Sequence, residues 1–148
     1  MSLFGLFQIS GSALGAERLR AEVATSNLAN AETTRTPEGG PYRRRMVVFQ
    51  GQPASPFRLL LANSAGGEQA EPAGGVRVSG VVEDAAAPLR RYEPGHPDAD
   101  AEGYVAYPNI SPVQEMVDLM GAERAYELNA SAVEAAKQMI QQSLQILK

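Results

Sequence analysis

The sequence contains no cysteine and only one histidine among its 148 residues. Without cysteine, the chain can form neither a disulfide framework nor a thiolate metal site. The single histidine, His96, lies between Gly95 and Pro97 in a turn-like stretch and cannot build an ordinary zinc site alone. No serine lies in the sequence context of a nucleophile elbow. We therefore expect His96 to be a loop residue, and we predict no catalytic residue, no cofactor and no metal site.

Long apolar runs are also absent, and no run approaches the roughly twenty residues that a membrane span needs. The first seventeen residues hold no Lys or Arg, and glycine and polar residues interrupt their apolar positions, unlike a Sec signal peptide. The formal net charge is −4, with one short basic cluster, which argues against nucleic acid as the main partner. We expect no membrane insertion, and a chain that leaves the cytoplasm would need another route.

Two charged stretches have a functional and an ordinary interpretation. Arg43–Arg45 could contact nucleic acid or anionic lipid, but three charges at the start of a strand usually form a solvated sheet edge. Asp98–Gly103 begins like a Ca²⁺ loop, with carboxylates at its first, third and fifth positions and glycine at its sixth. Asn109, however, occupies the twelfth position, where such a loop needs a bidentate Glu. We expect a solvated edge and a solvated acidic turn.

Residues 1–36 are predicted to form an N-terminal helical arm. Apolar residues recur there at a three-and-four spacing, beside a second row spaced by seven. These two rows are Leu6, Ile9, Ala13, Ala16 and Val23, and Phe7, Leu14, Ala21 and Leu28. The face then becomes amide at Asn27 and Asn30, although asparagine is a mediocre helix former. These amides either hydrogen-bond another chain segment or mark a helix end that unravels.

Residues 111–148 are predicted to form a C-terminal helix that pairs with the N-terminal arm. Ser111 can cap the helix, Pro112 suits its first position, and Gln114 can complete a capping box. A strict three-four row then runs through Leu119, Ala122, Tyr126, Asn129, Val133, Ala136, Ile140, Ser143 and Leu147. Its residues are small, so we expect a helix that is marginal alone and stable only when packed.

Residues 37–110 are predicted to form a small β-rich module between the two helices. The expected strands are Tyr42–Gln50, Gly75–Val82, Leu89–Tyr92 and Tyr104–Tyr107. A flexible loop at about 51–74 carries an apolar island, Phe57 and Leu59–Leu61, which we expect to dock against a neighbour. Because the module connects both helices at one end, the helices should lie antiparallel. The predicted fold class is α+β, with long N- and C-terminal helices packed antiparallel as a coiled-coil-like pair and a small β-rich module between them.

Several of these motifs resemble those of a known family. Ile9–Leu14 and Ala24–Thr33 are similar to the N-terminal motif of bacterial flagellar rod, hook and hook-associated proteins. Further blocks resemble the FlgC family of proximal rod proteins within that superfamily. These blocks are Pro41–Arg43, Val47–Phe49, Gly75–Val78, Tyr92–Ala99, Gly103–Val105, Pro108–Ile110, Glu115–Val117, Arg124–Tyr126 and Asn129. Leu128 departs from the family, which more often places alanine before that asparagine.

The resemblance implies a structural subunit that polymerises through its terminal helices into the hollow proximal rod. It implies export through the flagellar type III apparatus without a cleaved signal, and contacts with itself, other rod proteins, and ring or adapter proteins of the basal body. The assembly interface would include Leu6, Ile9, Leu14, Val23, Asn27, Leu28, Asn30, Leu119, Tyr126, Asn129, Val133, Ile140 and Leu147. The alternative is a helical adapter or chaperone of a type III secretion system that never polymerises.

Overall fold

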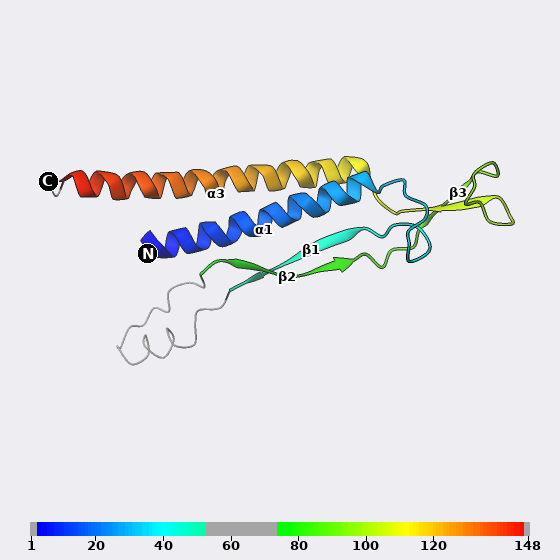
Figure 1. Ribbon diagram of the computed structural model, residues 1–148, viewed down its shortest axis with the longest axis horizontal. Coiled ribbons are helices and arrows are strands. Elements are labelled where there is room, and N and C mark those ends of the chain that lie inside the picture. The colour runs from blue at the N-terminus through cyan, green and yellow to red at the C-terminus, as the bar shows by residue number, and fades with distance from the viewer. Residues whose placement is uncertain (1–2, 53–73, 147–148) are drawn as a thin grey trace, which may run out of the picture. The chain divides into compact units, whose positions relative to one another are not determined.

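The computed structural model of the protein describes residues 3–52 and 74–146. It contains two long helices, α1 (Leu3–Ala29) and α3 (Pro112–Ile146), with all described strands between them in sequence (Figure 1). The strands are β1 (Arg45–Gly51), β2 (Val76–Glu83), β3 (Leu89–Tyr92) and β4 (Tyr104–Tyr107). The α+β class, the two terminal helices and the four expected strands are therefore confirmed. Leu147 and the apolar island Phe57 and Leu59–Leu61 lie outside the described residues.

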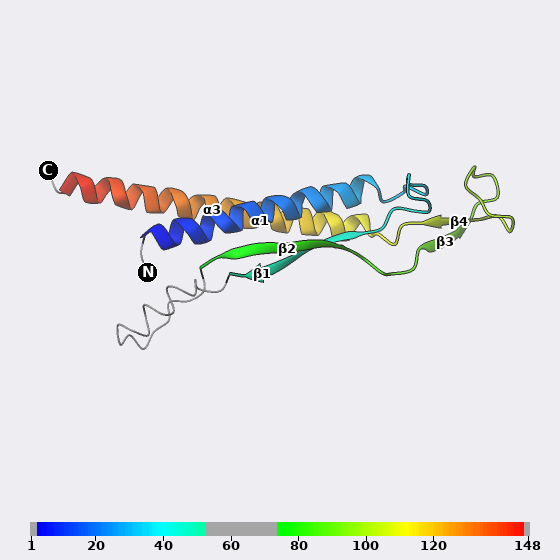
Figure 2. The ribbon, with the colours of Figure 1, turned by 60° about the horizontal axis from the view of Figure 1, so that its bottom comes forward.

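The strands form two separate two-stranded sheets, β1–β2 and β3–β4. Gln52 N donates to Gly75 O over 3.0 Å, and Asp84 N donates to Arg44 O over 2.7 Å, so β1 and β2 run antiparallel. β3 and β4 form a hairpin in the register Leu89 opposite Tyr107 and Tyr92 opposite Tyr104 (Figure 2). Neither sheet has enough strands to be stable without packing against something else.

The first strand begins three residues later than Tyr42, where the sequence predicts its start. Tyr42 N donates to Thr33 O over 3.0 Å, so this part of the chain is folded back on the segment that follows α1. That hydrogen bond replaces a strand ladder at Tyr42, and regular pairing starts only at Arg45. The local alternation of residues could not show this, because Thr33 is a partner from outside the strand.

The structure divides into two compact units, each of which draws on both helices and on β1 and β2. The first unit takes the described parts of Met1–Arg18, Phe49–Ser79 and Arg124–Lys148. The second takes Leu19–Val48 and Gly80–Glu123, and so contains the β3–β4 hairpin. The division into an arm (1–36), a β module (37–110) and a C-terminal helix (111–148) stays a prediction.

In the first unit, a serine joins α1 to the start of β2. The Ser12 hydroxyl donates to Ile9 O over 2.7 Å and accepts from Val76 N over 3.0 Å. Gly75 adopts φ +102°, and a Cβ at this position would collide with the Ser12 hydroxyl. Glycine at position 75 therefore allows the backbone to pass close to the helix. The buried residues in the described part of this unit are small: Ser10, Ala16 and Ala136.

In the second unit, the end of α1 and the beginning of α3 lie side by side. Asn27 bonds Glu115, and Arg20 bonds Asp118, so the residue numbers rise on one helix as they fall on the other. The two segments are therefore antiparallel, as the sequence predicts. The buried residues of these two segments are Ala24, Asn27, Glu115 and Ala122, so polar side chains make up half of the set.

Candidate functional site

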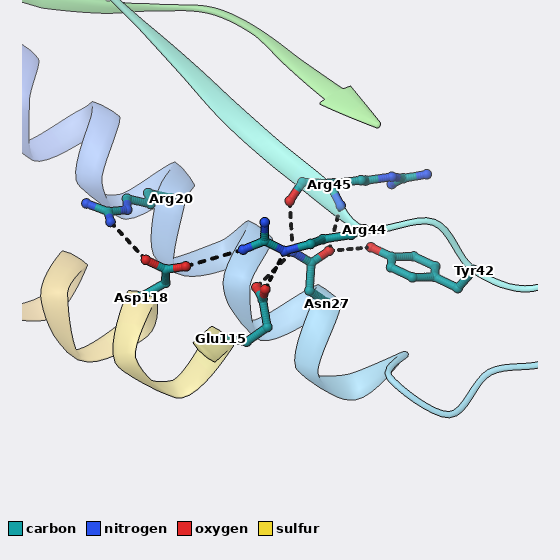
Figure 3. Close-up of polar contacts among 7 residues, drawn as sticks. All are labelled: Arg20, Asn27, Tyr42, Arg44, Arg45, Glu115 and Asp118. Carbon is teal, nitrogen blue, oxygen red and sulfur yellow. Dashed lines mark hydrogen bonds and ion pairs between the residues drawn. The ribbon is translucent and has the colours of Figure 1, made fainter. Parts of the chain in front are cut away.

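The most densely bonded polar group of the second unit is the side chain of Asn27, which is only 1% exposed (Figure 3). Its Nδ2 donates to Arg45 O over 2.8 Å and to Glu115 Oε2 over 2.9 Å. Its Oδ1 accepts from Arg45 N over 2.9 Å and from the Tyr42 hydroxyl over 3.2 Å. A primary amide offers two donors and two acceptor lone pairs, so the hydrogen-bonding capacity of Asn27 is fully used.

Glu115 lies in the first turn of α3 and is 2% exposed. Its Oε1 accepts from Arg44 Nε over 2.6 Å, and its Oε2 accepts from Asn27. Burial of a carboxylate is costly unless a cation and hydrogen-bond donors surround it. The unpaired backbone N–H groups at the start of a helix also favour a negative charge at this place. Glu115 is therefore held by three different sources of positive potential.

The charges continue from Glu115 outward in an alternating chain. Arg44 Nη2 contacts Asp118 Oδ2 over 3.3 Å, and Asp118 Oδ1 accepts from Arg20 Nη2 over 3.2 Å. Asp118 and Arg20 are partly exposed, so solvent screens the outer pair more than the inner one. We call the whole set the polar junction. It comprises Arg20, Asn27, Tyr42, Arg44, Arg45, Glu115 and Asp118.

The expectation of a solvated basic edge is wrong for Arg44, whose side chain is only 23% exposed. The first turn of α3 presents Glu115 and Asp118 to it, and two carboxylates hold the guanidinium better than water alone. Arg43 is exposed, as expected. The Arg45 side chain pairs with Glu83 over 3.5 Å and lies over the Tyr42 ring at 5.6 Å.

The two asparagines at the end of α1 behave differently. The Asn27 amide bonds other chain segments, which confirms the first of the two interpretations for that residue. The Asn30 amide instead donates to Ser26 O over 2.9 Å and accepts from the Thr33 hydroxyl over 3.2 Å. Because α1 ends at Ala29, Asn30 belongs to the helix end, as the second interpretation proposed.

Sequence reasoning missed Arg20, Glu115 and Asp118, although a signal was present for two of them. Arg20 lies in the gap between Ala16 and Val23 of the three-four row on α1. Glu115 lies four residues before Leu119 and extends the row of α3. A charged residue on an otherwise apolar or small row indicates a buried polar partner on the facing helix. Asp118 lies off that row, and its sequence position offers no such signal.

The predicted interface residues differ in their solvent exposure. Asn27 is buried and uses its polar atoms within the chain, whereas Ile9 and Tyr126 are exposed. The other described members are half-buried: Leu6, Leu14, Val23, Leu28, Asn30, Leu119, Asn129, Val133 and Ile140. Contacts of these residues with another subunit stay a prediction.

The fully buried apolar side chains among the described residues of α3 are alanines, whereas many of its large apolar side chains are exposed. Ala122 and Ala136 are fully buried, whereas Val113 is 71% exposed and Met120 is 55% exposed. Further exposed apolar residues along the helix are Met116, Val117, Leu128, Met139 and Leu144. Val113, Met116, Val117 and Met120 recur at a three-four spacing within the second unit, and such an exposed apolar row is typical of a surface that contacts another protein. The three-four row predicted from the sequence is a different one, which includes the alanines.

The acidic turn of the β3–β4 hairpin is hydrogen-bonded as well as solvated. Asp100 Oδ1 accepts from Tyr104 N over 2.8 Å and from Glu102 N over 3.0 Å, and Oδ2 pairs with Arg90. The Tyr104 N–H bond is the main cause that lowers the pKa of Asp100 below 3.8. His96 lies in the same turn, where its Nδ1 accepts from Asp98 N over 3.1 Å. Within residues 3–52 and 74–146, no cluster of acidic, histidine or cysteine side chains is suited to hold a metal ion.

The described helices also bear on membrane association. Over these same ranges, neither α1 nor α3 combines the length and the apolar character that a bilayer-crossing segment requires.

Two family models match the chain, one at each end. Residues 7–35 match the flagella basal body rod protein family, and residues 101–146 match the C-terminal region of the flagellar basal body rod FlgEFG proteins. Flagellar basal-body rod protein FlgC of Bacillus subtilis is 43% identical over 100% of both chains. FlgC of Escherichia coli O157:H7 is 43% identical over 97% of both chains, and FlgC of Borreliella burgdorferi is 37% identical over 100% of this chain and 99% of its own. The chain therefore belongs to the FlgC family of flagellar basal-body rod proteins.

Proposed function

We propose that this chain, a structural subunit of the flagellar rod by its family, enters the rod through the faces of α1 and α3 that its own fold leaves accessible. The observation that carries the proposal is the exposed apolar row of α3 in the second unit, which comprises Val113, Met116, Val117 and Met120. Burying one such side chain fully contributes about 1.5–3 kcal/mol. A few of them on each subunit suffice to drive association once neighbours are present.

The proposed interface combines this row with the half-buried residues of both helices named above. Contacts between different patches of neighbouring subunits do not close on themselves, and they generate helical assemblies. A hollow proximal rod built from this chain and other rod proteins is the assembly that fits. At the base of the rod, the proposed partners are ring or adapter proteins of the basal body. A non-polymerising adapter or chaperone is not favoured by the comparisons.

The proposal also includes how the chain is exported and what kind of role it has. The chain would be exported unfolded through the flagellar type III apparatus without a cleaved signal, and would act in the rod that crosses the periplasm. Among residues 3–52 and 74–146, the buried apolar residues are few and mostly small, which supports easy unfolding before export. Its role is mechanical, and we propose no enzymatic activity, cofactor, nucleic acid partner or membrane insertion.

Substitution of the exposed row of α3 tests this proposal. Met120→Glu places a charge in the proposed interface without touching the buried face of the helix. Gln138→Glu adds the same charge at another exposed position of α3 and is the matched control. Flagellated cells should fall at least about tenfold with Met120→Glu, because an unpaired charge in an apolar interface costs several kcal/mol. The control should swim normally.

Two measurements separate assembly from folding and export. Circular dichroism of the purified variant should show unchanged helix content, and the variant should still appear outside the cytoplasm. Normal rod numbers in cells that carry Met120→Glu would contradict the proposed interface.

A further inference from the structure

The helix segments of the second unit have little apolar shape with which to choose their alignment. Their buried apolar residues are Ala24 and Ala122, and alanine contributes the least buried area of any apolar side chain with a Cβ. Alanines interlock little with a facing helix, so these two residues specify an alignment only weakly. Another interaction must therefore select the observed register.

The ion pairs do not select it. A slide of seven residues would bring Arg20 to the place of Asn27, beside Glu115. Arg20 could then pair with that carboxylate, so charge alone tolerates both alignments. Arginine has five N–H donors but no acceptor. It could not accept the hydrogen bond that Asn27 Oδ1 accepts from Arg45 N in the observed register.

The amide of Asn27 does distinguish the two alignments. It contacts the backbone of β1 at Arg45 through both a donor and an acceptor, and it contacts α3 at Glu115. A seven-residue slide moves the helix about 10 Å along its axis, far beyond any hydrogen bond. Every buried polar group that loses its partner then opposes the slide. We propose that Asn27 is the residue that fixes the register of α1 against both β1 and α3 in this unit.

This role differs from general stabilisation, and it is independent of the rod. A buried asparagine on an otherwise apolar row is known to select the register of paired helices, even though it lowers their stability. Here the asparagine is a positioning residue: it decides which alignment forms, and Arg44 with Glu115 and Asp118 then stabilises that alignment. The inference concerns a single chain, so it can be tested on the monomer and does not depend on the proposed interface.

Distance measurements between spin labels test the register directly. The chain has no cysteine, so Thr25→Cys on α1 and Met120→Cys on α3 provide the only two labelling sites in the full-length protein. Both positions are exposed. The labelled monomer should give a single narrow interspin distance. Adding Asn27→Leu should produce a second or displaced distance, shifted by up to about 10 Å, while helix content stays the same.

Asn30→Leu is the matched control, because Asn30 lies one turn later and bonds only its own helix end. It should keep the single distance of the parent protein. A parent-like distance in the Asn27→Leu variant would overturn the inference, even if that variant is less stable. An equal shift in the Asn30→Leu variant would overturn it as well.

A second pair of variants decides the matter if Asn27→Leu does not fold. Asn27→Asp removes both donors and sets a carboxylate against Glu115, so it should broaden the distance distribution. Combining it with Glu115→Gln supplies a donor from the opposite side and should narrow the distribution again. Failure of the double variant to narrow it, or a narrow distribution in Asn27→Asp alone, would contradict a register role.

Discussion

The two units of this protein join their helices to the β-strands by different means. The second unit relies on the polar junction, in which one asparagine and one ion-paired glutamate are almost completely buried. The first unit buries small residues, Ser10, Ala16 and Ala136, and connects α1 to β2 through the Ser12 hydroxyl. Directional bonds define a geometry even where little apolar area is available, whereas small buried residues permit close approach but define less.

This difference predicts that the two units differ in local stability. Both units expose apolar side chains of α3, such as Met120 in the second and Leu128 in the first, but the buried polar junction lies in the second unit. We expect the second unit to be the more resistant to local unfolding in the monomer. Amide hydrogen exchange measures this directly, since protection reports the free energy of local opening. Equal protection in both units would contradict the expected difference in local stability.

The largest effect should follow from removing the cation of the junction. Arg44→Ala leaves Glu115 buried without its guanidinium, which should lower the free energy of unfolding by about 3 kcal/mol. Urea denaturation of the monomer measures the loss, and amide exchange should place it in the second unit. Arg43→Ala is the control, and an exposed neighbour of this kind should change stability by less than about 0.5 kcal/mol. A similar loss in both variants would mean that the buried pair is not the cause.

A smaller effect is expected in the first unit from Gly75→Ala. The residue has φ +102°, and its new Cβ would meet the Ser12 hydroxyl, so the substitution should cost about 2 kcal/mol. Gly74→Ala is the adjacent control, because a Cβ there would have no atom within 4 Å. The loss of protection should appear in β2 and α1 of the first unit. If it appeared in the second unit instead, the two units would not be independent.

The hairpin should respond to acid through Asp100. Its pKa in the folded protein lies below the ordinary value of 3.8, mainly because Tyr104 N–H donates to the carboxylate. A lowered pKa means that the stabilisation is complete above 3.8 and is lost as the pH falls through the folded value. The amide signals of β3 and β4 in NMR spectra should therefore move below pH 3.8. Asp100→Asn should abolish this step, and an unchanged step would assign it to another group.

The smallest effect should occur in the same hairpin at alkaline pH. The Tyr107 hydroxyl donates to Glu93 Oε2 over 2.8 Å, and this bond is the main cause that raises the pKa of Tyr107 above 10.0. The neutral phenol is the bonded form, so its stabilisation is complete below 10.0 and is lost as the pH rises through the folded value. Phenolate absorbance measured against pH should show that Tyr107 loses its proton above the ordinary pKa of 10.0. Glu93→Gln should bring that titration back toward the ordinary value.

Much of the fold could be predicted from the sequence, because helices and strands depend on short-range patterns. Pro112 after Ser111 marked the start of α3, and the alternation in Gly75–Val82 marked β2 to within one residue. The α+β class followed from the order of these elements. The motifs around Asn27 and in the hairpin also indicated the family, since they are continuous in sequence and need no knowledge of contacts.

The polar junction was only partly predictable. Asn27 was identified as a residue whose amide needs a partner, because an amide on an apolar helix face is costly without one. Its partners were not predictable: Arg45 is 18 residues away and Glu115 is 88 residues away in sequence. Arg43 and Arg44 also look alike in the sequence, yet one is exposed and the other is ion-paired.

The sequence by itself thus determined the two helices, the four strands and the family of this protein, because periodicity, capping and contiguous motifs are local properties. Only the tertiary structure decided which charges are buried, since the environment of an arginine or a glutamate depends on segments that meet in space. It also decided which face of α3 is left exposed. A three-four row predicts that a helix has a buried side. Which residues face outward depends on the elements that pack against the helix and on the size of their side chains.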